Sequence, residues 1–169
     1  MNKFGQFILY YYLCKKFIEM KTDKLCIDDY VINTRNGSYI KIDAITNRKV
    51  GYHRNGDKSM SRLVYACREE IEPIELNPSF FESLGLFDIT KCGDAIYKSE
   101  YGSVYIGYSS IYGTVRIDFD DSDTEVFFKC KYFHTLINVL KCMSEEHEEI
   151  INSVLAALDE AMSNLIKKN

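Results

Sequence analysis

The segment IEPIELNPSFFESLGLF at residues 71–87 constrains the fold more than any other stretch, because it holds both prolines of the chain. Pro73 has no backbone N–H to give to a strand ladder, so it ends a sheet or lies at its edge. Asn77 is a good helix cap, Pro78 suits the first helical position, and Gly85 suits the left-handed residue that stops a helix. The segment therefore predicts a strand end and one short helix that join two folded units.

Residues 20–72, which precede this joint, show short strand patterns separated by tight turns. Asn36-Gly37 lies between apolar runs and is a strong hairpin signal. In the run 39–46, aliphatic residues alternate with polar ones, which is typical of a half-buried strand. The expected strands are residues 30–34, 39–46, 49–54 and, less regularly, 61–67. Short strands with tight turns indicate a small bent sheet or a barrel-like unit.

Residues 88–145, which follow the joint, predict an antiparallel meander and then a helix. Val115, Ile117 and Phe119 alternate with charged residues, so one face of their strand is apolar and the other faces water. The expected strands are residues 94–100, 102–110, 113–121 and 124–131, and the expected helices are residues 132–143 and 146–169. Apolar residues at helical spacing allow these helices to cover the apolar face of the meander.

The whole chain has 169 residues, which is enough for one ordinary domain or two small ones. Hydrophobic residues make up 46% of it, which argues against disorder, and the abundance of Tyr and Phe favours strands. Residues 1–19 add an apolar N-terminal helix. We therefore expect an α+β protein: a small bent β-sheet or barrel-like unit (20–72), joined by a short helix (73–87) to an antiparallel β-meander covered by C-terminal helices (88–145 and 146–169).

The charges are unevenly distributed, since residues 1–75 are slightly basic whereas residues 76–169 are acidic and dominate the net charge of −4. An acidic half repels a phosphate backbone, so nucleic acid would have to contact the N-terminal half. The six cysteines show no C-x-x-C pair and no zinc-finger spacing, and no secretory signal or membrane-length apolar run is visible. We expect a cytoplasmic protein with reduced cysteines, no cofactor and no membrane span.

Three motifs follow one another along the chain: MKTDKLCIDDYVIN from Met20, IEPIELNPSFFESLGLF at 71–87 and YFHTLINVL at 132–140. Together they cover about Met20–Met143 and resemble a family of uncharacterised small proteins encoded by Bacteroidetes and by their phages and mobile elements. The chain departs from the family pattern at Asp29, where glycine is usual, and at Thr135 and Ile137, where Glu and Gln are usual. The resemblance implies an origin in a phage or mobile element, and it implies no reaction.

His134, in the third motif, is a candidate for acid–base chemistry because imidazole titrates near neutrality. The sequence offers it no identifiable nucleophile or acid partner, so we expect a structural histidine that starts a helix and bonds a strand-end or loop carbonyl. An acidic run lies nearby in the sequence: Asp118, Asp120, Asp121, Asp123 and Glu125. The run lacks the glycine and the final glutamate of a calcium loop, so it predicts no metal site. It predicts a solvated hairpin and, alternatively, a surface for a protein partner.

Basic side chains surround Tyr52 in the first β unit: Arg48, Lys49, His53, Arg54, Lys58 and Arg62. Cations around an aromatic ring on a small sheet could bind single-stranded nucleic acid through phosphate contacts and base stacking. The other interpretation is an edge hairpin that its charges keep soluble and unpaired. The sequence favours the edge hairpin, because the acidic half of the chain cancels the long-range attraction to nucleic acid.

No P-loop, G-x-S-x-G, H-E-x-x-H or dinucleotide-binding pattern occurs in the chain, so the sequence predicts no catalytic residue. The acidic, Tyr-rich second half favours a non-enzymatic protein that binds a protein partner, with an inhibitor- or immunity-like role, because Tyr anchors many interfaces and acidic surfaces suit basic partners. The alternative is a nucleic-acid-binding accessory protein that uses the basic hairpin Arg48–Arg62.

Overall fold

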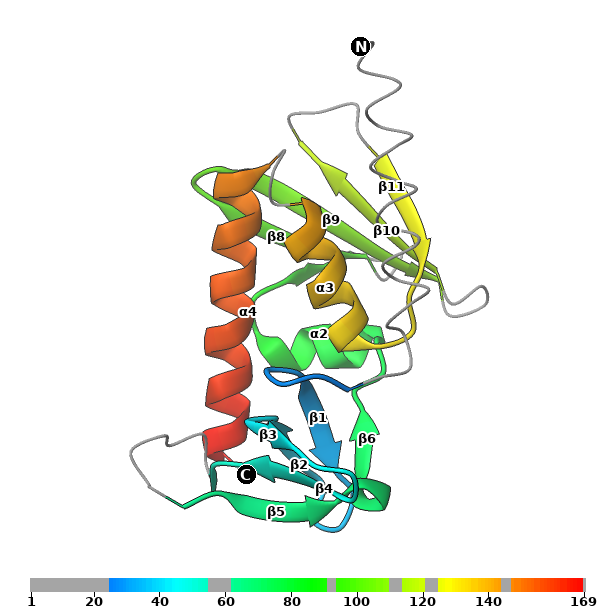
Figure 1. The fold of residues 1–169 in the computed structure, drawn as a ribbon. Coiled ribbons are helices and arrows are strands. Elements are labelled where there is room, and N and C mark those ends of the chain that lie inside the picture. Colours follow the sequence, from blue (N-terminus) through cyan, green and yellow to red (C-terminus); the bar gives the residue numbers. More distant parts are fainter. Residues whose placement is uncertain are drawn as a thin grey trace.

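A computed structural model describes residues 25–54, 62–90, 94–109, 114–120, 125–143 and 147–168. The expected N-terminal helix at residues 1–19 lies outside these ranges. The described chain is an α+β fold in which a large antiparallel sheet and a smaller β region lie at the two ends of a long helix (Figure 1). Among the described residues, no helix is both long enough and apolar enough to cross a lipid bilayer.

The elements that the sequence pattern predicts occur in the expected order, and a short strand at residues 88–89 adds an unpredicted fifth strand to the meander. The strands are β1 (Tyr30–Asn33), β2 (Ser38–Lys41), β3 (Ala44–Ile45), β4 (Lys49–Tyr52), β5 (Val64–Cys67), β6 (Ile71–Pro73), β7 (Asp88–Ile89), β8 (Ala95–Ser99), β9 (Gly102–Ser109), β10 (Thr114–Phe119) and β11 (Glu125–Lys129). The helices are α2 (Pro78–Leu84), α3 (Phe133–Met143) and α4 (Glu148–Lys168), and a single 3-10 turn, η2 (Arg68–Glu70), precedes β6.

The meander is a five-stranded antiparallel sheet in the order β11-β10-β9-β8-β7. Val115, Ile117 and Phe119 of β10 are buried, whereas the residues that alternate with them are half-buried on the opposite face. Helices α3 and α4 place their apolar stripes against the buried face and share one core with it. The α+β class and the helix-covered meander predicted from the sequence are therefore confirmed.

The small β region consists of two three-stranded sheets, β2-β1-β6 and β3-β4-β5, and it is not a closed barrel. The single strand expected at residues 39–46 is divided between them at Ile42 and Asp43. The Ile42 N–H donates to the Asp29 carbonyl, while the Asp43 N–H donates to the Gly51 carbonyl, both at 2.9 Å. The chain thus changes partner strands at this point, which bends the unit and buries Ile42 in its small core. Of the two predicted alternatives, the bent sheet is the one observed.

The joint at residues 71–87 folds as its residues predict. Pro73 ends the edge strand β6, and the Asn77 side chain accepts the Phe80 N–H at 2.8 Å to cap α2. Gly85 ends the helix with φ of 67°, a left-handed conformation that glycine adopts without the Cβ clash of other residues. Phe80, Phe81 and Leu84 of α2 are buried in the main core.

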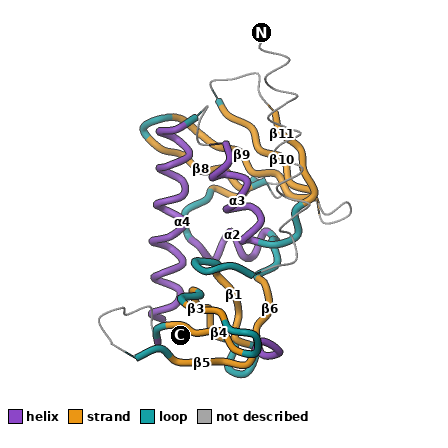
Figure 2. The backbone as a smooth tube through the Cα atoms, in the orientation of Figure 1, coloured by secondary structure: helices purple, strands orange, loops and turns teal. Residues whose placement is uncertain are grey.

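Helix α4 runs past both β regions and not along the meander alone (Figure 2). Its upper turns pack on β8 and β9, and its lower part contacts β2. Just past the middle of the helix, Asp159 receives the Lys41 ammonium at 2.6 Å and the Tyr30 hydroxyl. The joint and α4 together therefore hold the small sheets against the rest of the fold.

Candidate functional site

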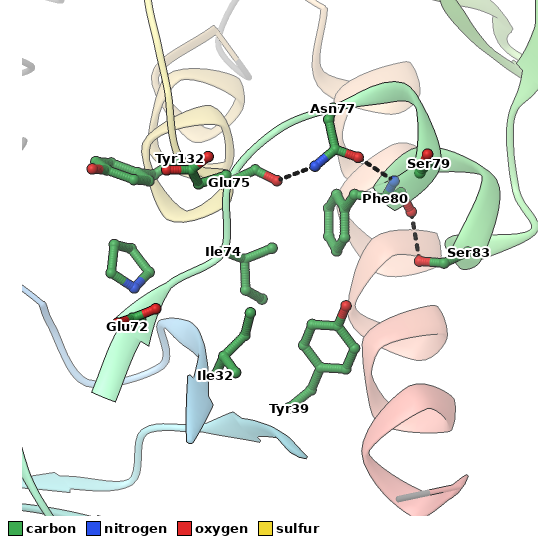
Figure 3. A pocket seen from close by; sticks show the side chains of 11 residues that line it. Ile32, Tyr39, Glu72, Ile74, Glu75, Asn77, Ser79, Phe80, Ser83 and Tyr132 are labelled. Carbon is green, nitrogen blue, oxygen red and sulfur yellow. Dashed lines mark hydrogen bonds between the residues drawn. The ribbon is translucent and has the colours of Figure 1, made fainter. Parts of the chain in front are cut away.

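A groove with a volume of about 620 Å³ opens between the sheet β2-β1-β6 and helix α2 (Figure 3). Tyr39 of β2 pairs with Ile32 of β1, and Ile32 pairs in turn with Glu72 of β6. Directly paired residues in antiparallel strands place their side chains on the same face of the sheet. The strand register therefore lines up these three side chains, from a tyrosine at one side of the groove to a carboxylate at the other.

The remaining lining residues come from the joint, from α2 and from the start of α3: Pro73, Ile74, Glu75, Asn77, Ser79, Phe80, Ser83 and Tyr132. Hydrogen bonds fix the α2 side of the groove, since the Ser83 hydroxyl donates to the Phe80 carbonyl at 2.6 Å. In Figure 3, Ile32 and Ile74 lie between Tyr39 and Tyr132. The groove thus has an apolar centre, three aromatic side chains (Tyr39, Phe80 and Tyr132) and a polar border.

The backbone beside the groove is already paired. Glu75 and Tyr132 form an isolated antiparallel bridge. On either side of it, the Leu76 N–H donates to the Lys131 carbonyl and the Phe133 N–H donates to the Ile74 carbonyl, both at 2.9 Å. These bonds tie the joint to the start of α3, so that Tyr132 is brought to the groove by a contact between segments far apart in the sequence.

The electrostatic character of the groove comes from Glu72 and Glu75, which are both exposed. The Lys131 ammonium lies 2.7 Å from Glu75 Oε1 and 5.2 Å from the centroid of the Tyr132 ring. The hydrogen bond to Glu75 and its charge raise the pKa of Lys131. Glu72 has no ion-pair partner among the described residues. An exposed pair such as Lys131–Glu75 contributes little stability, so both carboxylates are available to a ligand at small cost.

His134 lies behind Tyr132, with the two rings stacked at an interplanar angle of 11° and a centroid distance of 5.8 Å. It is 4% exposed, and neither ring nitrogen has a hydrogen-bond partner within the described part of the chain. The expected bond to a strand-end or loop carbonyl is therefore wrong there. Helix packing has placed the imidazole among core side chains, where Tyr132 stacking and burial hold it.

A buried carboxyl group lies near enough to His134 for their charges to interact. Burial raises the pKa of Asp29, and the hydrogen bond from the Cys26 N–H, at 2.6 Å, and the charges of His134 and Lys141 act in the opposite direction. The Cys130 thiol donates to the Tyr132 carbonyl at 3.4 Å. Burial raises the pKa of Cys130 to about 12, which leaves it protonated and a poor nucleophile at neutral pH.

The described ranges contain no group of three or more His, Cys, Asp or Glu side chains placed to hold a metal ion. Cys67, Cys130 and Cys142 are free thiols. Within these ranges, neither ring nitrogen of His134 is bonded to a nucleophile, and burial keeps the Cys130 thiol protonated. The arrangement around the groove can bind a ligand by stacking, apolar contact and charge, and it shows no nucleophile activated by a base.

The structure separates the basic residues predicted to bind nucleic acid. Arg48 and Lys49 are exposed at the start of β4, whereas Arg54 and Arg62 are exposed beyond its other end. Lys58 lies outside the described residues. The Tyr52 ring packs on the small core and its hydroxyl lies 3.4 Å from Asn33 Nδ2, so this ring is not free to stack on a base.

Another tyrosine, which the sequence pattern did not indicate, is better placed for stacking. Tyr65 of β5 is 50% exposed, and it pairs with Gly51 on the face that also carries Lys49. A Cβ on Gly51 would lie 3.0 Å from the Tyr65 ring, so the ring covers the glycine. Gly51 was the signal in the sequence that could have indicated this contact, because a glycine within a strand often marks a site that another group approaches closely.

Two carboxylates of the predicted acidic run, Asp118 and Asp120, lie within the described residues. Asp118 is half-buried on the outer face of the meander, and Asp120 is exposed at the end of β10. Hydrogen bonds from the side chains of Ser103 and Tyr105 lower the pKa of Asp120. Asp121 and Asp123 lie outside the described residues. The two described carboxylates are therefore on the water-facing side, as the alternation of β10 predicts.

The groove residues Tyr39, Glu72 and Tyr132 were not predicted as a site, although one signal was present. Tyr39 has the same strand parity as Lys41 and Asp43 and alternates with Ile40 and Ile42, which places it on the face away from the small core. Nothing in the sequence indicates that this face meets Tyr132, because a long-range contact brings the two together.

A scan of the chain against protein-family models, a search of curated proteins and a search of solved structures each found no match.

Proposed function

We propose that this protein is a non-enzymatic, protein-binding protein with an inhibitor- or immunity-like role, and that it derives from a phage or mobile element. The observation that supports the proposal is the groove between β2-β1-β6 and α2. Its apolar centre, at Ile32 and Ile74, is bordered by Tyr39 and Tyr132 and by exposed polar groups. Protein interfaces have this composition, with an apolar centre, enriched tyrosine and a polar, wet rim.

A partner-capture experiment with matched variants tests this function. The whole chain is immobilised and exposed to a lysate of a Bacteroidetes host, and the retained proteins are quantified by mass spectrometry. Ser83→Arg fills the groove from α2, and Glu72→Lys reverses a lining charge. Glu82→Lys is the control: it makes the same charge reversal as Glu72→Lys, but on α2, at an exposed residue that does not line the groove.

We expect a partner that is retained by the unmodified chain and by Glu82→Lys, and that is lost from both groove variants. Thermal unfolding confirms that each variant is folded before it is used. A partner retained equally by every variant would show that binding does not use the groove. The absence of any partner above background would refute the proposed protein-binding function.

The outer face of the meander is a second surface for the same function. Asp118 and Asp120 lie on it, together with the 53% exposed Phe127 of β11. Acidic carboxylates beside an exposed aromatic ring suit a basic protein partner. Asp118→Lys/Asp120→Lys, added to the capture experiment, shows whether this face contributes; unchanged retention assigns the binding to the groove alone.

The exposed Tyr65 favours one alternative, a nucleic-acid-binding accessory protein. It shares a face with Lys49, and Arg48 is exposed at the same end of β4. This function predicts a low-salt gel shift with single-stranded DNA that weakens steeply with salt and is lost in Arg48→Glu/Arg54→Glu and in Tyr65→Ala. If 50 mM salt gives no retardation of a 30-nucleotide probe, the alternative is excluded.

A further inference from the structure

We infer that the groove takes a short partner segment in the polyproline II conformation, with a Lys or Arg side chain of that segment placed against Glu72. This inference rests on the proposed protein-binding function and names the kind of segment that the groove recognises. Three features of the groove support it: the state of the adjacent backbone, the size and aromatic lining of the cavity, and its charge.

The backbone beside the groove is poorly suited to adding a strand. Pro73 lies in the edge strand β6 and has no N–H to donate. Beyond it, Ile74 and Leu76 already bond to residues 131–133. A segment recognised by strand addition needs a row of free N–H and C=O groups. A polyproline II segment forms no such ladder, because its backbone remains solvated.

The size and the lining select a short segment. The volume of about 620 Å³ falls in the range of pockets that bury a ligand of drug-like size, and therefore a few residues, whereas a helix with its side chains is about 10–12 Å across. Tyr39 and Tyr132 lie on either side of Ile32 and Ile74 (Figure 3). Aromatic-lined grooves bind proline-rich segments, since these are already extended and lose little entropy on binding.

The charge of the groove indicates that the bound segment carries a basic side chain. Glu72 is exposed in the groove without a cation among the described residues, and Glu75 is held by the exposed Lys131 at 2.7 Å. The lining side chains include two carboxylates and, within the described ranges, no Lys, Arg or His. A cation on the segment is therefore complementary to the groove, whereas an acidic segment would be repelled.

The test is a selection of random 12-residue peptides displayed on phage, with the whole protein as bait and Ser83→Arg for counter-selection. The enriched peptides are then synthesised, and their affinity is measured by fluorescence anisotropy. We expect enriched sequences that contain proline and at least one Lys or Arg. Glu72→Gln should weaken their binding about tenfold, which is typical of a hydrogen bond to a charged group, and Glu82→Gln should leave it unchanged.

A double-substitution cycle locates the cation. Replacing the basic residue of the peptide by Gln should weaken binding to the unmodified protein and have almost no further effect on Glu72→Gln. Enriched peptides without proline or without a basic residue would overturn the inference, and so would the absence of peptides that depend on the groove. If the capture experiment retains a groove-dependent partner while this selection fails, the protein-binding function stands and the polyproline inference falls.

Discussion

The Lys41 ammonium and Asp159 Oδ1 are 2.6 Å apart, although 118 residues separate them in the sequence. The same carboxylate accepts the Tyr30 hydroxyl, and the ammonium also lies 5.0 Å from the centroid of the Tyr30 ring. Both contacts join α4 to the sheet β2-β1-β6. Because that sheet forms one side of the groove, Asp159 helps to determine where Tyr39 and Ile32 lie relative to α2.

Tyr30→Phe should lower the free energy of unfolding by about 2 kcal/mol, because it removes a hydrogen bond to a charged acceptor and leaves the ring packing in place. Burial and the bond to Asp159 raise the pKa of Tyr30, so the hydroxyl is a donor throughout the ordinary pH range. Urea unfolding measures the change. Tyr97→Phe is the matched control: its hydroxyl lies 2.9 Å from the neutral Ser153 hydroxyl, and we expect a loss of about 1 kcal/mol. Equal losses would contradict a special contribution from Asp159.

Gly85→Ala should destabilise the fold by about 1 kcal/mol, because the residue has φ of 67° and a side chain is strained in that conformation. No atom lies within 4 Å of a Cβ built at this position, so the cost arises from the backbone and not from a clash. Gly85→Asn should cost less, since Asn tolerates the left-handed region. Thermal unfolding of the three proteins checks the order; Asn and Ala variants of equal stability would refute the backbone explanation.

Gly107→Ala should destabilise the meander by about 1 kcal/mol through overpacking, because the new Cβ would lie 2.9 Å from Asp94 Oδ1. The clash depends on one side chain, so Asp94→Ala should relieve most of the cost. The measurement is a double-mutant cycle of urea unfolding for Gly107→Ala and Asp94→Ala. An additive result would show that Gly107 is needed for another reason.

Asp29→Asn should become more stable relative to the unmodified protein as the pH rises from 3 to 7. Burial raises the pKa of Asp29 in the folded state, so its contribution is fully present below the unfolded pKa of about 3.9 and is lost as the pH rises through the folded value. Asn keeps an acceptor for the Cys26 N–H. Thermal unfolding at several pH values gives the difference.

The control for Asp29→Asn is Asp28→Asn, which removes a neighbouring exposed carboxylate at a residue with φ of 72°, where Asn is also tolerated. If the stability of both variants, relative to the unmodified protein, changes with pH to the same extent, the effect comes from net charge and not from burial of Asp29.

The sequence predicted elements whose signals are local. Asn77 and Gly85 cap α2, and both caps were predictable because they depend only on the chemistry of these two residues and on the adjacent helix. The alternation at Val115 and Ile117 predicted the buried face of β10, since period-two burial follows from strand geometry. The division of residues 39–46 at Ile42 was not predictable, because the run alternates continuously and the break depends on pairing with Asp29 and Gly51.

The candidate site was much less predictable than the fold. His134 was singled out by its chemistry, yet packing buries it behind Tyr132 without the expected carbonyl bond in the described part of the chain. Tyr52 was singled out by its basic neighbours, yet its ring packs against the small core. In the same sheet, Tyr65 is the aromatic residue that is exposed. Residue type indicates what a side chain can do, and burial decides whether it is available.

By itself, the sequence determined the α+β class, the capped helix of the joint and the helix-covered meander, because caps, turns and hydrophobic periods act over a few residues. The tertiary structure alone decided the groove. Tyr39, Glu72 and Tyr132 meet there through strand register and through the pairing of residues 74–76 with 131–133, and Asp159 holds α4 against the same sheet. Contacts of this range depend on how the elements pack, and no local pattern of residues encodes them.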